Sequence, residues 1–212
     1  MPFMKKTITL LASLFLILAT AHAQTSKYHV LVNKSKLVSE DEMIIEDEEI
    51  AVHSQDWTKY KAEDLAFVAY YPKEPERTVQ KVSTEVCELD MHMIMYAPDS
   101  GDDNAAYSVI RSDYPEDQFT DADDEYNNTV LDGAVEGAVS NVQGKLVFDN
   151  KVKFNGYPGR SIKIEINGGF IYINAYLVVN SMFITQVICL TANDGNTAIE
   201  RFLNSFEIIK TK

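Results

Sequence analysis

Residues 160–190 read RSIKIEINGGFIYINAYLVVNSMFITQVICL and decide the fold. Their first part alternates isoleucine with polar side chains, which is the period-two pattern of a β-strand with one buried face. Gly168-Gly169 predicts a two-residue hairpin turn, and Asn180-Ser181 predicts a second turn. The stretch therefore predicts three consecutive antiparallel strands, at residues 160–167, 170–179 and 182–190.

The middle strand of the three is apolar on both faces. Its odd-numbered apolar residues are Ile171, Ile173, Leu177 and Val179, and its even-numbered ones are Phe170, Tyr172, Tyr176 and Val178. A strand of this kind belongs in the middle of a sheet that other elements cover on both sides. We therefore expect packing elements above and below this sheet.

Four earlier strands are expected, at residues 65–70, 78–86, 88–97 and 105–111. The second and third of these would pair as a hairpin. Residues 88–97 alternate apolar with charged side chains, as a half-buried strand does. Pro98 to Asp103 are turn-forming residues and would end that strand.

Two helices complete the predicted domain. Asn127, Asn128 and Thr129 offer caps for the first helix, whose apolar face runs from Leu131 to Val142 before Gly144 ends it. Two glycines inside this helix lower its propensity and indicate that its backbone lies close to the sheet.

The second helix closes the domain. Asn193 or Asp194 would cap it, and its apolar stripe comprises Ala198, Ile199, Phe202 and Leu203. The order of strands, helix, strands and helix predicts an α+β domain: a mainly antiparallel sheet with helices packed on both faces.

Several short motifs resemble a known group of proteins. They are LDGA at 131–134, GKL at 144–146, NGYPGR at 155–160, YLVVN at 176–180 and RFLNSF at 201–206. Over residues 57–209 the chain resembles small exported bacterial proteins of unknown role that share the PsbP-like superfamily fold, an α/β/α sandwich. This resemblance implies binding and accessory roles more than catalysis, and it brings no partner-contacting residue to a position here.

The N-terminus has the pattern of a signal peptide. Lys5 and Lys6 are followed by an uncharged apolar run from Ile8 to Thr20, and then by Ala21-His22-Ala23. The run is shorter than the roughly 20 residues that span a membrane, so cleavage before Gln24 is favoured over an uncleaved anchor. We expect an exported bacterial protein, periplasmic or secreted, with no stable membrane insertion after cleavage.

Three segments follow from this reading: a signal peptide at 1–23, an acidic and partly flexible extension at 24–56, and a single α+β domain at 57–212. The signal peptide holds two lysines and no acid, so the mature chain has 17 basic and 32 acidic side chains, a net charge of −15. Such an acidic surface argues against nucleic-acid partners and against adsorption to anionic lipid.

The acidic residues and the two cysteines raise alternatives. Asp121, Asp123 and Glu125 have the spacing of a calcium loop, but they lack its glycine, so we expect no metal site and no cofactor. An oxidising compartment would allow a disulfide between Cys87 and Cys189. The alternative is that both are buried apolar residues.

The candidates for a binding site are Tyr157 and Arg160, because the turn before them would hold both at the mouth of a strand. Together they would form one wall of a pocket for an anionic or aromatic ligand, since arginine pairs with carboxylates in a bidentate way. The alternative is that Tyr157 packs on the sheet edge and Arg160 pairs with a nearby acid. His92 is expected on the surface, and no zinc-ligand spacing, nucleophile elbow or P-loop occurs in the chain.

The sequence therefore favours a non-catalytic exported binding or accessory module, whose partner would be an unidentified protein or small ligand. Two alternatives stay open. One is an enzyme whose site is assembled from distant residues, and the other is a structural protein of the envelope. The absence of a catalytic motif favours the first reading but names no ligand.

Overall fold

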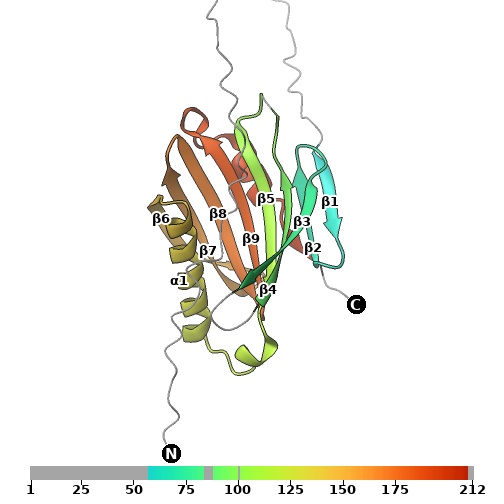
Figure 1. Ribbon diagram of the computed structural model, residues 1–212, viewed down its shortest axis with the longest axis vertical. Helices are drawn as coiled ribbons and strands as arrows, with labels where there is room; N and C mark the ends of the chain where they lie inside the picture. The colour runs from blue at the N-terminus through green and yellow to red at the C-terminus, as the bar shows by residue number, and fades with distance from the viewer. Residues whose placement is uncertain (1–56, 84–87, 100, 210–212) are drawn as a thin grey trace, which may run out of the picture. The chain divides into compact units, whose positions relative to one another are not determined.

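The computed structural model describes residues 57–83, 88–99 and 101–209 (Figure 1). The described residues form a seven-stranded sheet, a three-stranded sheet and two α-helices. The strands are β1 (Thr58–Ala62), β2 (Phe67–Tyr71), β3 (Glu76–Ser83), β4 (Glu88–Tyr96), β5 (Asn104–Asp113), β6 (Lys145–Phe154), β7 (Tyr157–Ile166), β8 (Gly169–Val178), β9 (Ser181–Leu190) and β10 (Glu207–Ile208). The α-helices are α1 (Asp124–Asn141) and α2 (Thr197–Leu203), and short 3-10 helices span Glu116–Gln118 and Thr191–Asn193.

The large sheet has the strand order β3-β4-β5-β9-β8-β7-β6, and every neighbouring pair is antiparallel. The predicted hairpin of β3 and β4 is confirmed, as is the run of three antiparallel strands β7, β8 and β9. β8 lies between β7 and β9, with further strands outside both. The apolar character of both its faces is consistent with this central place.

Both predicted turns in this run were wrong by one residue. The first turn comprises Asn167 and Gly168, which has a φ of 83°, while Gly169 already belongs to β8. A side chain at Gly169 would collide with the carbonyl oxygen of Cys189 on β9.

The second turn comprises Val179 and Asn180, so Val179 is 66% exposed and not part of the core. Its φ of 57° is left-handed, a conformation that a β-branched residue adopts at a cost. The sequence expectation failed because valine is a strand former and carries no turn signal of its own.

β6 was not predicted. Most of its side chains are exposed, because β6 forms the edge of the large sheet and lacks an apolar alternation. Asn155-Gly156 connects it to β7, and both turn residues have positive φ, at 50° and 87°. This is the two-residue turn that Asn-Gly favours, because its twist matches that of the flanking strands.

Helix α1 begins one turn before the predicted caps. Asp123 is the cap, and its carboxylate accepts a hydrogen bond from the Tyr126 backbone N–H at 2.8 Å. The helix contacts β7 and β8, and Gly137 is buried, as the expected close approach to the sheet requires. Gly144 follows the helix, and a Cβ there would lie 2.5 Å from the Ile164 side chain.

Helix α2 is capped by Asn196, not by Asn193 or Asp194, because the Asn196 side chain accepts from the backbone N–H groups of Ala198 and Ile199. The helix contacts β2, β5, β8 and β9. Its Ile199 and Phe202 belong to a largely aromatic core with Phe67, Tyr71, Tyr107, Tyr176, Phe183 and Phe206.

The fold is thus mainly antiparallel sheet with two helices. Cys189 is fully buried in the core, whereas its suggested disulfide partner Cys87 lies outside the described residues. The expected signal peptide and the 24–56 extension lie outside them as well. No helix among the described residues is long and apolar enough to cross a membrane.

Candidate functional site

Arg160 is buried and pairs with two carboxylates. Its side chain is 6% exposed; one guanidinium nitrogen donates to Asp149 on β6 at 3.1 Å, and another donates to Asp132 on α1. Burial lowers the pKa of Arg160. Burial also raises the pKa of Asp149, and the positive charge of Lys151 opposes that rise. Arg160 therefore pairs with nearby acids, as one of the two sequence interpretations had it.

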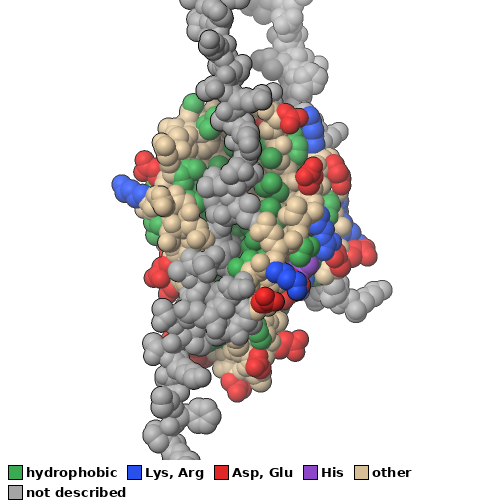
Figure 2. Space-filling model, in the orientation of Figure 1, with side chains coloured by type: hydrophobic (Ala, Val, Ile, Leu, Met, Phe, Trp, Pro, Cys, Tyr) green, Lys and Arg blue, Asp and Glu red, His purple; other side chains and the backbone are tan. Residues whose placement is uncertain are grey.

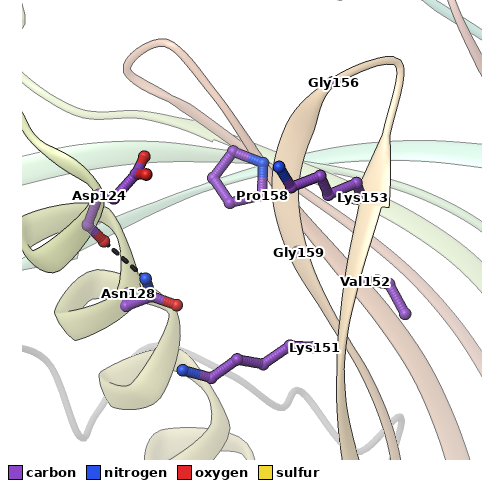
Figure 3. A pocket seen from close by; sticks show the side chains of 8 residues that line it. All are labelled: Asp124, Asn128, Lys151, Val152, Lys153, Gly156, Pro158 and Gly159. Atoms are coloured by element: carbon purple, nitrogen blue, oxygen red, sulfur yellow. Dashed lines mark hydrogen bonds between the residues drawn. The ribbon is translucent and has the colours of Figure 1, made fainter.

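A pocket of about 300 Å³ lies beside this ion-pair group, between the first turns of α1 and the β6–β7 hairpin (Figure 3). It is lined by Asp124, Asn128, Lys151, Val152, Lys153, Gly156, Pro158 and Gly159. Neither Tyr157 nor Arg160 lines it, although the turn and strand that carry them form one wall. Tyr157 and Arg160 therefore lie next to the pocket, whereas other residues of the same turn and strand line it.

The helical wall is held by the start of α1. The Asp123 cap fixes the first turn, and the Asn128 side chain donates to the Asp124 carbonyl oxygen at 2.6 Å (Figure 3). Asp124 and Asn128 are four residues apart, so they share one face of the helix. That face is turned toward the hairpin.

The hairpin wall is set by the register of β6 on β7. Lys151 pairs with Arg160 and Lys153 pairs with Pro158, so both lysines project from the sheet face that carries Arg160. The ammonium groups of both lysines point from β6 toward α1 (Figure 3). The pocket thus combines two cationic side chains on one wall with a carboxylate on the other.

Aromatic packing at the end of β6 holds the β6–β7 hairpin against the core. Phe154, the last residue of β6, stacks on Tyr176 with ring centroids 4.6 Å apart and contacts Phe206 at 5.5 Å. On β7, a Cβ at Gly159 would lie 2.6 Å from the Ala175 carbonyl oxygen and 2.7 Å from the Tyr176 ring. Because Gly159 has no side chain, β7 can pair closely with β8 at this point. This pairing fixes the position of the β6–β7 hairpin and of its two lysines.

The charges of the pocket are not paired with one another. Within the described residues, no ion pair shorter than 4.0 Å joins Asp124, Lys151 or Lys153 to any partner. The positive charge of Lys151 acts on Asp149, where it opposes the rise in pKa that burial causes. Lys153 and Asp124 are left as an opposite-charged pair that faces across the pocket without touching.

Sequence reasoning missed the four polar residues of this pocket. The Asn155-Gly156 pair is a strong hairpin signal, and it would have placed Lys151 and Lys153 on one face of the preceding strand. That a helix turn with Asp124 and Asn128 lies opposite depends on tertiary packing, which no local pattern reveals.

The other sequence candidates do not assemble a second site. Tyr157 is 36% exposed at the start of β7. His92, expected on the surface, is half buried on β4, and its Nδ1 atom has no hydrogen-bond partner. Asp123 serves as a helix cap, and the part of the chain that the structure describes contains no group of three His, Cys, Asp or Glu residues placed to hold a metal.

Comparison with known proteins finds similarity among solved structures. No family model and no curated protein matches the chain. The chain is similar to the solution structure of cyanobacterial PsbP (CyanoP) from Synechocystis sp. PCC 6803, at 11% sequence identity and a TM-score of 0.48. The match covers 74% of this chain and 95% of that one. A similarity at this level brings no functional residue or partner to this chain.

Proposed function

We propose that this protein is an exported, non-catalytic binding module and that its ligand site is the pocket between α1 and the β6–β7 hairpin. The observation that carries the proposal is the pocket itself, which has two ammonium groups and a carboxylate directed toward one space of about 300 Å³. A ligand of a few heavy atoms fits such a space, and charged side chains on rigid elements would orient it.

The lining residues favour binding over catalysis. They include one carboxylate and no Ser, Thr, Cys or His, so the pocket has no pairing of a hydroxyl or thiol nucleophile with a general base. Acid–base catalysis by two carboxylates would need a second carboxylate beside Asp124, and the pocket lining contains none. An enzyme site assembled elsewhere from distant residues stays the alternative hypothesis.

The proposal has two further parts: export of the protein, which rests on the sequence, and cover of both faces of the large sheet, which rests on packing. Export rests on the signal-peptide pattern of residues 1–23. Cover on both faces of the large sheet, as in a PsbP-like sandwich, is supported by two separate packings. Helix α1 contacts β7 and β8, while α2 belongs to the aromatic core that also includes the three-stranded sheet.

The test is a ligand-observed NMR screen of the purified chain against a library of small charged and polar fragments. Hits are then titrated against two variants that change α1. Asn128→Trp fills the pocket, and Glu136→Trp places the same side chain on an exposed helix position outside it. We expect hits that the first variant loses and the second keeps.

Either of two results contradicts the proposal. One is a screen in which no fragment perturbs the pocket; the other is a set of hits that bind equally well to both tryptophan variants. Thermal unfolding of both variants provides the folding control, because a collapsed Asn128→Trp variant would lose hits for an unrelated reason. In that case Pro158→Trp, on the opposite wall, replaces it.

A further inference from the structure

The charges around the pocket can be assigned in two groups. Arg160 and Lys151 supply two positive charges, and Asp132 and Asp149 supply two negative ones. Arg160 forms ion pairs with both carboxylates. Lys151 lies opposite Arg160 in the register, two residues from Asp149 on the same face of β6, and its charge acts on that carboxyl. This first group is balanced within itself. It consists of contacts among α1, β6 and β7 and needs no ligand.

The second group is Lys153 and Asp124. They lie on opposite walls of the pocket, and no ion pair joins them to each other or to any other described residue. In Figure 3 the Lys153 ammonium group and the Asp124 carboxylate stand on either side of Pro158. Apart from Lys151, whose charge offsets the carboxylates around Arg160, one positive and one negative charge thus face the same small space.

A purely anionic ligand fits this pair poorly. Its negative charge would be attracted by Lys153 and repelled by Asp124 in the same space, so much of the gain would cancel. A purely cationic ligand would likewise be attracted by Asp124 and repelled by Lys153. A small ligand with separated opposite charges satisfies both walls at once, with its carboxylate toward Lys153 and its ammonium group toward Asp124.

On this basis, and resting on the proposed function of the pocket, we propose that the ligand is a small zwitterion of the amino-carboxylate class. Asn128 adds an amide carbonyl at the helical wall, and the Pro158 ring gives an apolar surface between the two charges. A short aliphatic side chain on the ligand would lie against that ring. The site is open to solvent, so its ion pairs are screened and binding weakens with added salt.

The experiment uses three matched probes of one shape. Valine carries both charges, 3-methylbutanoate lacks the ammonium group, and 2-methylpropylamine lacks the carboxylate. Each is titrated into isotopically labelled protein while the backbone amide signals of Gly156 and Gly159 are followed. We expect valine to bind, and each single-charge probe to bind roughly fivefold more weakly or worse, as the loss of one exposed ion pair predicts.

Charge-removing variants test which pocket residue binds each charged group of valine. Lys153→Gln and Asp124→Asn should each weaken valine binding by about fivefold. Asp124→Asn should also remove the preference for valine over 3-methylbutanoate. The matched controls are Lys145→Gln on the same strand and Glu136→Gln on the same helix, which remove equal charges outside the pocket and should leave binding unchanged.

The outcomes separate this inference from the proposed function. If 3-methylbutanoate or the amine binds as tightly as valine, or if Asp124→Asn has no effect, the zwitterion inference is overturned. The same holds if none of the three probes shifts the pocket signals while a fragment of another class does, and the proposed binding function then survives. If no small molecule binds the pocket, both fall together.

Discussion

Asp132 on α1 pairs with Arg160 on β7, 28 residues further along the chain, and thereby joins the helix to the sheet beside the candidate pocket. The same guanidinium reaches Asp149 on β6, so one side chain connects three elements. The surface elsewhere carries acidic side chains over several areas of the face in Figure 2. Arg160 thus pairs with two carboxylates beside the pocket lysines, and its charge offsets part of theirs.

Arg160→Ala should lower the free energy of unfolding by about 2–3 kcal/mol, because it leaves Asp149 partly buried without its partner and removes the link to α1. We discount the usual cost of a broken buried pair, since Asp132 is 54% exposed. Urea denaturation measures the change. Arg77→Ala is the matched control: its pair with Asp64 is more exposed, and its removal should cost less than about 1 kcal/mol. Equal losses in the two variants would contradict this account.

Val179→Asn should stabilise the protein by about 1 kcal/mol. Val179 has a φ of 57° and is 66% exposed, so the substitution relieves a strained left-handed backbone and gives up little packing. A gain of this size raises the melting temperature by several degrees. Val79→Asn is the control, since Val79 is also exposed but has no positive φ and lies in β3. A melting temperature of Val179→Asn at or below that of the wild type would show that the turn is not strained.

The sequence located the two turns beside β8 only to within one residue, whether or not the turn carries a chemical signal of its own. Gly168 and the Asn155-Gly156 pair mark their hairpins, whereas Val179 resembles the strand before it. Edge strand β6 escaped prediction because both its faces are largely exposed, which leaves no alternation to detect. Central β8 was recognised because both its faces are apolar.

The candidate site shows the same limit. Arg160 attracted attention as a charged residue after a glycine turn, but the sequence could not tell which acids would reach it. Asp132 and Asp149 approach it only because α1 packs on the sheet and β6 pairs with β7 in one particular register. A binding site formed by a helix turn and a hairpin is a property of the tertiary fold.

The stability of the protein should fall at alkaline pH through Tyr107. Burial raises the pKa of its phenol, and the hydrogen bond to Asp102, at 2.8 Å, adds to the rise. The unfolded chain releases this proton near pH 10, whereas the folded protein retains it. Stability is therefore fully present below the unfolded pKa and is lost as pH rises beyond it, by up to about 1.4 kcal/mol per pH unit for one proton.

The measurement is urea denaturation of the wild type and Tyr107→Phe between pH 8 and 11. The variant loses a hydrogen-bonded hydroxyl and is less stable at pH 8, but its stability should fall less steeply above pH 10. Tyr71, whose pKa burial raises well above its usual range, remains in both proteins and accounts for a shared part of the slope. Parallel curves for the two proteins would mean that Tyr107 ionises in the folded state.

The two faces of β8 should differ in their tolerance of a charge. Ile173 is 3% exposed, so Ile173→Asp buries an unpaired carboxylate and should cost several kcal/mol, enough to prevent folding at neutral pH. Tyr172, on the opposite face, is half buried; its hydroxyl donates to Asp194 at 2.6 Å, and the Lys163 ammonium group lies 4.9 Å from its ring centre. A carboxylate at position 172 therefore has a cation beside it and partial access to water.

We expect Tyr172→Asp to fold with a loss of roughly 1–2 kcal/mol, from the lost ring packing and the new repulsion of Asp194. Thermal melts of the two variants, at pH 7 and again at pH 4, measure the contrast. Protonation at the lower pH should recover part of the Ile173→Asp fold, because a neutral carboxyl is less costly to bury. If Ile173→Asp melts within a few degrees of the wild type, that face of the sheet is open to water and α1 does not protect it. If Tyr172→Asp is the more damaging change, Lys163 does not compensate a charge there, and the assignment of the two faces is wrong.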